Sequence, residues 1–281
     1  MLLRASLISA LDRLTAAHVP SPRMNAELLL MFTLSCDRAY LYGHPERELT
    51  SGEQARYEQA LAQRAQGVPA QYITGHQEFW DMDFVVTPAV LIPRPETEHV
   101  IETVLPRARV LPNPRIADVG TGSGCIALVL AKELPHAEIR ATDIFPPALE
   151  IARANAARHQ LESRIRFHET DLLWGFDPNA FDFVVSNPPY VGESEEDQVQ
   201  LEVRKFEPRN AIFAGPTGLE VIDRLIPQAH AALKPGGWLV MEISGTIANG
   251  VKRLLGGWAN LQITNDLQGI PRVASAQKAV P

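Results

Sequence analysis

The chain has 281 residues, of which 46% are hydrophobic and 21% charged, a composition typical of a globular protein with one large and one smaller domain. Its formal net charge of −7 argues against a non-specific nucleic-acid binder, which usually carries an excess of Lys and Arg. Cys36 and Cys125 are too few for a disulfide framework and lack metal-site spacing. No apolar run approaches the roughly 18 residues of a membrane span, and Asp12 interrupts the N-terminal segment where a signal peptide would be apolar. We expect a cytoplasmic protein with no membrane association.

The pattern of the first 75 residues predicts helices. Apolar residues of the first helix fall on one face, namely Leu2, Leu3, Leu7, Ile8, Leu11 and Leu14. A second helix is predicted to begin with Ser21 as its N-cap and Pro22 in its first turn. A third follows Thr50, which has capping-box spacing to Glu53, and ends near Gly67. Seven Arg balance seven acidic residues here, and we expect these arginines on solvated helix faces.

The next segment predicts a β-hairpin that connects two domains. The run HQEFWDMDFVVTPAVLI has the short strands and turns of a hairpin. Prolines then surround one predicted helix, ETEHVIETVL. We therefore expect a helical domain over residues 1–74, a hairpin linker over 75–90 and a second domain over 91–281.

From Arg115 onward, predicted strands and helices alternate. The strands are IADV, EIRATD, RIRFHETD, FDFVVS and WLVMEI, and the tail adds a helix and two further strands. The intervening helices include CIALVLAKEL, ALEIARANAARH and GLEVIDRLIPQAHAAL. Alternation of this kind predicts an α/β fold with a mostly parallel sheet that helices cover on both faces.

The segment DVGTGSG, from Asp118 to Gly124, lies where the first of these strands meets the first helix. Glycines there permit positive φ and a close backbone approach, and the helix N-terminus offers unpaired N–H groups to a ligand. A dinucleotide-binding fingerprint would have glycine at the sixth position from Gly120, but that position is Cys125. The spacing therefore disfavours a nicotinamide oxidoreductase.

Two carboxylates end the following strands. Asp143 ends EIRATD, and Asp171 ends the third strand. A carboxylate at Asp143 can accept hydrogen bonds from both hydroxyls of a ribose. The alternative is that both acids cap the turns that follow them. Together with the D-x-G-x-G-x-G loop, this arrangement resembles class I methyltransferases that use S-adenosylmethionine.

The segment VVSNPPYVG, from Val184 to Gly192, stops a strand on Asn187 and two prolines. Prolines cannot donate to a sheet ladder, so a rigid backbone with unpaired carbonyls follows the strand, at the edge where α/β sheets bind ligands. The side-chain oxygen of Asn187 and the carbonyl of Pro188 can accept both N–H bonds of a planar amide or amine. That favours a more tetrahedral nitrogen and its developing positive charge. Tyr190 can pack on the flat group.

Asn-Pro-Pro-Tyr at this position resembles methyltransferases of planar nitrogens, both glutamine enzymes and DNA N6-adenine or N4-cytosine enzymes. The flanking motifs narrow the resemblance: EFW, LIPRPETE, DVGTGSGCIAL, SNPPYV, EPRNAIFAGPTGL and LQGIPRV. With the helical N-terminal region, they are similar over nearly the whole chain to the PrmC/HemK family, the glutamine N5-methyltransferases of class 1 peptide release factors.

The resemblance implies a helical substrate-recognition domain and a Rossmann-like methyltransferase domain with a seven-stranded sheet. It implies S-adenosylmethionine as the methyl donor, S-adenosylhomocysteine as the product, no metal, and the glutamine of a Gly-Gly-Gln loop as the substrate. It places the donor on Gly120, Thr121, Gly122, Ser123, Gly124, Asp143, Asp171 and Asn187. It places catalysis and the substrate on Asn187, Pro188, Pro189 and Tyr190, with Phe79 in a motif that approaches the site.

Some assignments stay open within the resemblance. Many relatives have an aromatic residue directly after Asp171, whereas this chain has Leu172, so either Leu172 or Trp174 contacts the adenine. The roles of Arg94 and Glu96 do not follow from the sequence. A metal site at Glu96, Glu98 and His99 is disfavoured, because acids at a helix start complement its dipole.

Two related substrates are weighed against the release factor. The enzyme that methylates a large-subunit ribosomal protein shares Asn-Pro-Pro-Tyr but typically has Pro-Arg-Ser-Pro where this chain has Pro93-Arg94-Pro95-Glu96. A DNA methyltransferase needs a positive cleft to hold a flipped base, yet 19 basic and 26 acidic residues follow residue 75. We expect class 1 release factors as partners and no direct contact with nucleic acid.

Overall fold

The computed structural model describes residues 1–280, which divide into two compact units. The first unit comprises residues 1–76 and 200–206, and the second comprises residues 77–199 together with the chain from residue 207 onward. The predicted domain boundaries and the recognition role of the helical region stay predictions. Across residues 1–280, no helix combines the length and the apolar character that crossing a membrane requires.

The first unit is built from helices. They are α1 (Leu3–Ala16), α2 (Pro22–Leu34), α3 (Arg38–Gly43), α4 (Ser51–Ala65), α5 (Ala70–Thr74) and α9 (Leu201–Phe206). The predicted capping box is confirmed at α4, where the Glu53 N–H donates to Thr50 Oγ1 at 3.2 Å and the Thr50 N–H donates to Glu53 Oε2 at 2.9 Å. Helix α4 also ends as predicted, because Gly67 turns the chain with a φ of +91°.

The predicted start of the second helix is confirmed, and the predicted face of the first is wrong. Ser21 is the N-cap of α2 and Pro22 its first residue, although the φ of Ser21 is +47° and its side chain makes no cap hydrogen bond. The face predicted for α1 is shifted, because Leu2 and Ile8 are exposed. The buried stripe of α1 instead consists of Leu3, Ser6, Ala10 and Leu14. Two leucines and two small residues therefore face the core of this unit, where α2 and α4 pack against α1.

Arg64 departs from the expectation of solvated arginines, since it is only 3% exposed. Its guanidinium donates to Asn25 Oδ1 at 2.8 Å, to the Val68 carbonyl at 3.0 Å and to Glu202 Oε2 at 2.7 Å. The carboxylate of Glu202 thus partners a buried cation from a distant part of the chain. Through this pair, α9 joins the helical unit.

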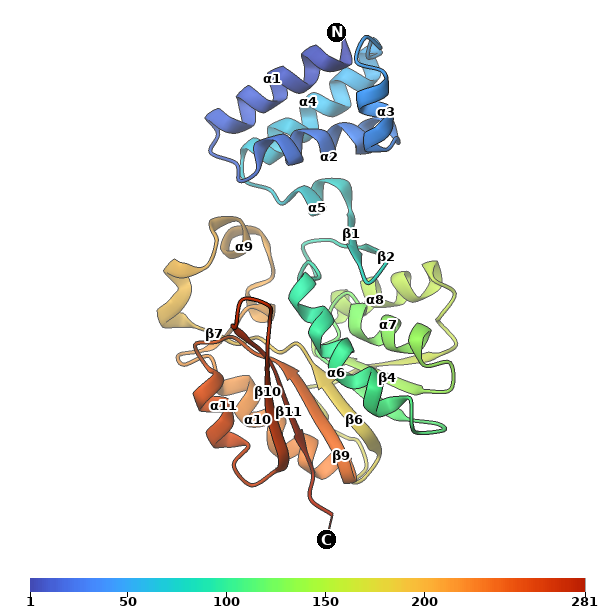
Figure 1. Ribbon diagram of the computed structural model, residues 1–281, viewed down its shortest axis with the longest axis vertical. Helices are drawn as coiled ribbons and strands as arrows, with labels where there is room; N and C mark the ends of the chain where they lie inside the picture. The colour runs from blue at the N-terminus through green and yellow to red at the C-terminus, as the bar shows by residue number, and fades with distance from the viewer. Residues whose placement is uncertain (281) are drawn as a thin grey trace. The chain divides into compact units, whose positions relative to one another are not determined.

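The second unit contains, among the described residues, a seven-stranded sheet in the order β10-β11-β9-β6-β3-β4-β5 (Figure 1). Its strands are β3 (Arg115–Val119), β4 (Glu138–Asp143), β5 (Ile165–Glu169), β6 (Phe181–Ser186), β9 (Leu233–Glu242), β10 (Ala259–Asn265) and β11 (Pro271–Gln277). Strands β3, β4, β5, β6 and β9 are parallel, whereas β11 is antiparallel to both of its neighbours. The predicted α/β fold with a mostly parallel sheet is confirmed.

Helices cover both faces of this sheet. One layer consists of α6 (Glu98–Ala108), α7 (Cys125–Glu133) and α8 (Pro146–Arg158), and the other of α10 (Glu220–Ala232) and α11 (Ala248–Leu254) (Figure 1). Because successive strand residues point to opposite faces, Ile116 and Val240 join one apolar cluster, while Ala117 and Leu239 join the other. Burial on both faces explains the continuous apolar runs of these strands.

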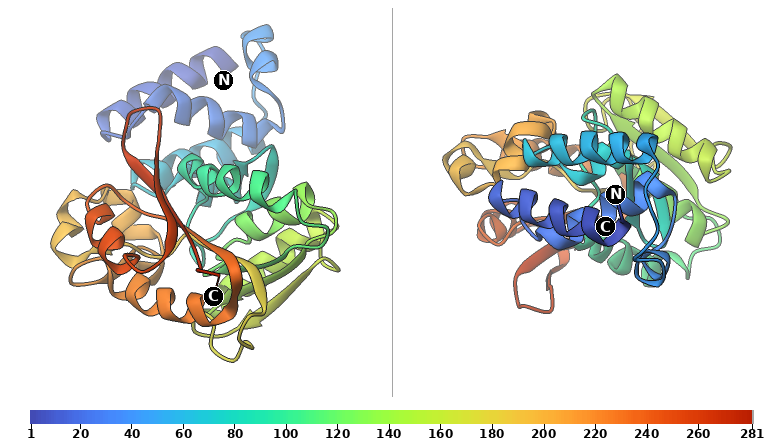
Figure 2. Two further views of the ribbon diagram at one scale, coloured as in Figure 1. Left: turned by 60° about the horizontal axis from the view of Figure 1, so that its bottom comes forward. Right: turned by 90° about the horizontal axis from the view of Figure 1, so that it is seen from above.

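Strands β10 and β11 form a long antiparallel hairpin at one edge of the sheet, drawn in red in Figure 2. Its turn is held by Asp266, which accepts hydrogen bonds from the N–H groups of Gln268 and Ile270. Asp266 also accepts from Arg272 Nε at 2.8 Å, and Arg272 reaches Glu96 at 3.7 Å. The LQGIPRV motif therefore presents a cation beside the residues that precede α6.

The predicted hairpin is confirmed as β1 (His76–Phe79) paired with β2 (Met82–Val85). Asn155 of α8 fixes β2, because its side chain accepts from the Val85 N–H at 2.7 Å and donates to the Val85 carbonyl at 3.0 Å. The same amide donates to the Ser123 carbonyl at 2.9 Å. One buried asparagine thus joins the hairpin to the glycine loop.

The sequence predicted no regular structure between residues 191 and 215, where the chain forms short elements. These are β7 (Val191–Gly192), η2 (Glu193–Gln198), η3 (Arg209–Ala211) and β8 (Phe213–Gly215), apart from α9 in the first unit. Gly218 follows with a φ of +81°, and a Cβ there would lie 2.5 Å from the Tyr190 carbonyl oxygen. The GPTGL motif therefore needs this glycine to approach the Asn-Pro-Pro-Tyr segment.

Candidate active site

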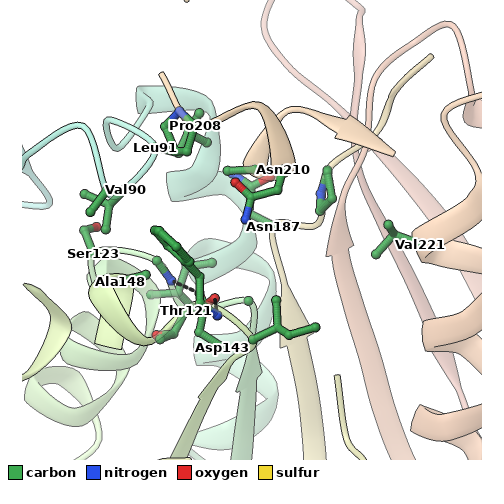
Figure 3. Close-up of a pocket in the computed structure, with 18 of the residues that line it drawn as sticks. Val90, Leu91, Thr121, Ser123, Asp143, Ala148, Asn187, Pro208, Asn210 and Val221 are labelled. Atoms are coloured by element: carbon green, nitrogen blue, oxygen red, sulfur yellow. Dashed lines mark hydrogen bonds between the residues drawn. The ribbon is translucent and has the colours of Figure 1, made fainter. Parts of the chain in front are cut away.

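A cavity of about 210 Å³ opens at the carboxyl ends of β3, β4 and β6. This is the edge at which open α/β sheets bind ligands. Figure 3 shows Thr121 and Asp143 on one side of the cavity and Asn187 and Asn210 on the other. The segment from Ala89 to Pro93 also lines it. The cavity therefore brings together the glycine loop and the start of the Asn-Pro-Pro-Tyr segment.

The glycine loop presents backbone to the cavity. Gly120 and Gly122 have φ values of +71° and +55°, line the cavity, and would place an added Cβ where no atom lies within 4 Å. Thr121 and Ser123 line it as well. Gly124 differs, since a Cβ there would lie 2.7 Å from Leu128 Cδ1. Gly124 thus permits close packing of helices α7 and α8, and it does not line the cavity.

Asp143 ends β4 with its carboxylate beside this loop. Oδ2 accepts from the Gly122 N–H at 2.9 Å, and Oδ1 accepts from the Phe145 N–H at 2.9 Å. Burial raises the pKa of this carboxyl, while the two backbone N–H groups oppose the rise. Each oxygen retains a lone pair, and the residue lines the cavity. Asp143 can therefore accept further hydrogen bonds from a bound ligand.

Asp118 holds the glycine loop in place by hydrogen bonds. Its Oδ2 accepts from Thr121 Oγ1 at 2.6 Å and from the Ala127 N–H at 3.1 Å, which ties β3 to the loop and to α7. Complete burial raises the pKa of Asp118 to about 7. Within the described chain, Oδ1 of Asp118 has no hydrogen-bond partner. The first acid of the motif is thus a buried support for the glycine loop.

The sequence left Leu172 and Trp174, which follow β5, as alternatives for the contact with the adenine, and the structure places these two residues differently. Leu172 has a φ of +55° and lines the cavity. Trp174 is 79% exposed and lines a different hollow, with Arg140 and His168. Asp171 lines the cavity and pairs with Arg224. Leu172, rather than Trp174, is placed to contact a ligand in the cavity.

The Asn-Pro-Pro-Tyr segment begins directly after β6. Asn187 lines the cavity, and its Nδ2 donates to Thr97 Oγ1 at 3.1 Å. Pro189 also lines the cavity, whereas Pro188 is buried. The Tyr190 hydroxyl donates to Glu242 Oε1 at 3.0 Å, and burial, followed by the charge of Glu242, raises the pKa of that phenol. The segment therefore meets the cavity through Asn187 and Pro189, while Tyr190 is anchored behind it.

Sequence reasoning missed two residues that hold this segment. Thr97 ends the 3₁₀ helix η1 (Pro95–Thr97), and its Oγ1 donates to Glu242 Oε2 at 2.6 Å. Glu242 ends β9 and is 2% exposed. The sequence did contain a signal for Glu242, because this acidic residue lies within the apolar run LVMEI, in the strand that pairs with β6. A lone buried acid in such a strand needs a polar partner.

Other motif residues form the rim of the cavity. Arg94 pairs with Glu207 and donates to the Ile92 carbonyl at 3.0 Å, and the Ile92 N–H donates to Glu207 Oε2 at 3.1 Å. This pairing fixes the segment that carries Pro208 and Asn210, both of which line the cavity (Figure 3). The LIPRPETE and EPRNAIFAGPTGL motifs, which lie far apart in the sequence, are thus held together by the contacts of Glu207 with Arg94 and Ile92.

Phe79 does not line the cavity. Its side chain is 2% exposed and lies in the apolar core, where its ring centroid is 6.2 Å from that of Phe84. The structure thus gives Phe79 a packing role, and its predicted contact with the substrate stays a prediction. Among residues 1–280, no three His, Cys, Asp or Glu side chains are grouped as metal ligands would be.

Known proteins resemble the chain along its whole length. The family PrmC N-terminal domain matches residues 6–75, and the family Methyltransferase small domain matches residues 98–205. A protein named Release factor glutamine methyltransferase from Koribacter versatilis is 56% identical over 279 residues, which cover 99% of each chain. Another with that name, from Moorella thermoacetica, is 43% identical over 275 residues, which cover 97% of each chain.

Solved structures show the same fold. The T. thermophilus 16S rRNA N2 G1207 methyltransferase, in complex with AdoMet and guanosine, matches with a TM-score of 0.54 and 17% identity over 72% of this chain and 49% of that one. The fold is that of a class I S-adenosylmethionine-dependent methyltransferase. With 56% identity over nearly its full length, the chain belongs to the family of release factor glutamine methyltransferases.

Proposed function

We propose that this protein transfers a methyl group from S-adenosylmethionine to the side-chain amide nitrogen of the glutamine in the Gly-Gly-Gln motif of class 1 release factors. The names of its relatives support this substrate. The observation that carries the chemistry is the orientation of the Asn187 amide. Its nitrogen donates to Thr97, so its oxygen is left to accept from a ligand in the cavity.

The residues at the other end of the cavity fit the methyl donor. The open space beside Gly120 and Gly122 accommodates a group that a Cβ would displace. Asp143 would accept from ribose hydroxyls, and Leu172 would pack on the adenine, since both line the cavity. When bound, the donor supplies an electrophilic methyl group on a sulfonium. The loop and Asp143 would hold the donor and so would place its methyl group beside the nucleophile.

The nucleophile is a weak one, because the lone pair of a carboxamide nitrogen is delocalised into its carbonyl. Asn187 Oδ1 and the Pro188 carbonyl would accept the two N–H bonds of the substrate amide. Acceptors in that position favour a tetrahedral nitrogen and the positive charge that develops on it. The N–C bond forms as the S–C bond breaks, and the nitrogen then releases one proton to solvent. In this scheme no side chain of the enzyme must change its protonation state.

A methyl-transfer assay tests this function directly. Purified protein is incubated with methyl-labelled S-adenosylmethionine and a class 1 release factor, or with its variant in which the motif is Gly-Gly-Ala. We expect label in the release factor and none in the variant. Equal labelling of the two proteins would show that the glutamine of this motif is not the acceptor.

The same assay separates the related substrates. A large-subunit ribosomal protein and double-stranded DNA are tested in parallel at the same concentrations. We expect the release factor to be labelled and the other two to remain unlabelled. Labelled ribosomal protein or DNA, with an unlabelled release factor, would overturn the assignment of the substrate while leaving a planar nitrogen as the nucleophile.

A further inference from the structure

A chain of hydrogen bonds connects both ends of the Asn-Pro-Pro-Tyr segment to one buried carboxylate. Asn187 Nδ2 donates to Thr97 Oγ1 at 3.1 Å, and Thr97 Oγ1 donates to Glu242 Oε2 at 2.6 Å. The other oxygen of Glu242 accepts from the Tyr190 hydroxyl at 3.0 Å. Thr97 is 1% and Glu242 is 2% exposed, so water competes little for these bonds.

The direction of this chain is set at Glu242. In its ionised state the carboxylate of Glu242 only accepts hydrogen bonds, so the Thr97 hydroxyl proton then points at Glu242. The lone pairs of Thr97 Oγ1 are then all that it can offer to Asn187. A group that only accepts must face the NH₂ of the Asn187 amide, and this turns Oδ1 towards the cavity. In that state the charge of Glu242, acting through Thr97, favours the orientation in which Oδ1 of Asn187 faces the cavity.

Neighbouring charges bear on the ionisation of Glu242. Burial raises the pKa of this carboxyl, and the Thr97 and Tyr190 hydroxyls oppose the rise. The carboxylate of Glu96 disfavours its charge, while the guanidinium of Arg272 favours it. Arg272 is kept nearby by Asp266 in the β10–β11 turn. The LQGIPRV motif thus contributes a cation to the surroundings of the tetrapeptide.

We infer that Glu242 and Thr97 are positioning residues, which hold the Asn187 amide with its oxygen towards the substrate nitrogen and anchor Tyr190 at the same time. This role deepens the proposed function and rests on it. A reversed amide would direct its NH₂ at the N–H groups of the substrate, and two donors repel each other. Neither residue needs to touch the reacting atoms.

Two substitutions of Thr97 distinguish the effect of its hydroxyl group from the effect of its side-chain volume. Thr97→Val keeps the volume and removes the bonds to Asn187 and to Glu242, so we expect kcat to fall about 10- to 100-fold, as a small misplacement of a reacting group does. The KM for the release factor is expected to change less than about threefold, because the lost contact is made at the reacting nitrogen. Thr97→Ser keeps the hydroxyl and is expected to recover most of the lost rate.

A matched control is available in the next helix. Thr103 of α6 is also buried, and its Oγ1 donates to the His99 carbonyl within the same helix. Thr103→Val therefore makes the same chemical change without touching the chain from Asn187 to Glu242. We expect Thr103→Val to keep the wild-type kcat within about twofold, the spread of a substitution with no contact to the site.

Glu242→Gln tests the direction of the chain. A glutamine amide can donate to Thr97, and Thr97 can then donate to Asn187 Oδ1, so both orientations of the Asn187 amide become accessible. We expect kcat to fall about tenfold, the cost of roughly one lost hydrogen bond to a charged group. Donor binding measured by calorimetry is expected to stay near the wild-type value, which also shows that the variant is folded.

A measurement that does not depend on enzyme turnover completes the test of the positioning role. The side-chain amide protons of Asn187 are followed by ¹⁵N NMR and assigned by the signal that Asn187→Ala removes. We expect slow exchange with water in the wild type and in Thr103→Val, and faster exchange in Thr97→Val and Glu242→Gln. If Thr97→Val and Glu242→Gln matched Thr103→Val in both kcat and exchange, the positioning role would be refuted. A wild-type enzyme that leaves release factor unlabelled would instead refute the proposed function, and slow exchange would still report on the hydrogen bonds.

Discussion

The two ends of the cavity are built by different means. At the donor end, which is where we propose that the methyl donor binds, the surface includes two glycines with positive φ, the N–H groups of the loop, and one carboxylate at the end of the neighbouring strand. At the Asn187 end, the surface depends on the side chains of Thr97 in η1, of Asn187 directly after β6 and of Glu242 at the end of β9. The donor end fits a ligand by leaving room for it. The Asn187 end orients one polar group by a chain of hydrogen bonds. Substitutions at the two ends should therefore affect different steps, donor binding at one and methyl transfer at the other.

The largest effect is expected for Asn187→Ala. Loss of an acceptor at the reacting nitrogen should lower the rate of methyl transfer about 100- to 1000-fold, as removal of one stabilising hydrogen-bond partner does in other enzymes. The rate is measured in a single turnover with the donor saturating, so that binding does not limit it. Donor affinity by calorimetry should fall by much less, although some loss is expected because Asn187 lines the shared cavity. A donor affinity that collapses together with the rate would show that the two ends do not act separately.

The converse effect is expected for Gly122→Ala. Its φ of +55° and the open space beside it mean that a methyl group strains the loop and occupies part of the ligand space. We expect donor affinity to fall about 10- to 100-fold, since a clash and backbone strain of a few kcal/mol correspond to that range. Gly269→Ala is the matched control, because Gly269 also has a positive φ, +80°, and open space around it, but lies in the β10–β11 turn. Equal losses in the two variants would point to general destabilisation rather than to the donor site.

The contrast between the two ends of the cavity also explains which residues of the site could be predicted from the sequence. The glycine loop is local, so Asp118, Gly120 and Gly122 lie within five consecutive residues, and Asp143 ends the next strand. Spacing alone was enough to bring these residues together. By contrast, Thr97 and Glu242 are 145 residues apart, and no local pattern connects either of them to Asn187. Only the strand order, with β9 beside β6, brings them to one place.

Similar reasoning applies to three individual residues. The sequence left Leu172 and Trp174 as alternatives; Leu172 has a φ of +55° and lines the cavity, whereas Trp174 does not. Phe79 shares a motif with the site, but its large apolar side chain is buried in the core, where burial stabilises the fold. Arg64 looked like a surface cation because its partner Glu202 lies far along the chain. The burial of Arg64 thus depended on a contact between residues that are far apart in the sequence.

Asp143→Asn sharpens the account of the donor end. The amide retains the shape but loses the charge that strengthens hydrogen bonds to ribose hydroxyls, so donor affinity should fall about tenfold.

The pH dependence of donor binding follows from the same carboxyl group of Asp143. Burial raises the pKa of Asp143, so on acidification the carboxylate takes up its proton at a higher pH than an exposed aspartate would. Donor affinity in the wild type should therefore weaken as the pH falls through this pKa, whereas Asp143→Asn should lack this step. Calorimetric titrations at several pH values measure both, and identical pH profiles would exclude Asp143 as the titrating acceptor.

The smallest expected effect distinguishes Leu172 from Trp174. Leu172 lines the cavity, so Leu172→Ala removes part of an apolar surface and should weaken donor binding about fivefold, which corresponds to roughly 1 kcal/mol. Trp174 is 79% exposed and lies outside the cavity, so Trp174→Ala should leave donor affinity within about twofold of the wild type, as surface substitutions usually do. Both affinities are measured by calorimetry without the release factor, which confines the comparison to the donor end. If Trp174→Ala weakened binding more than Leu172→Ala, the loop after β5 would have to rearrange when the donor binds, and the adenine contact would belong to the tryptophan.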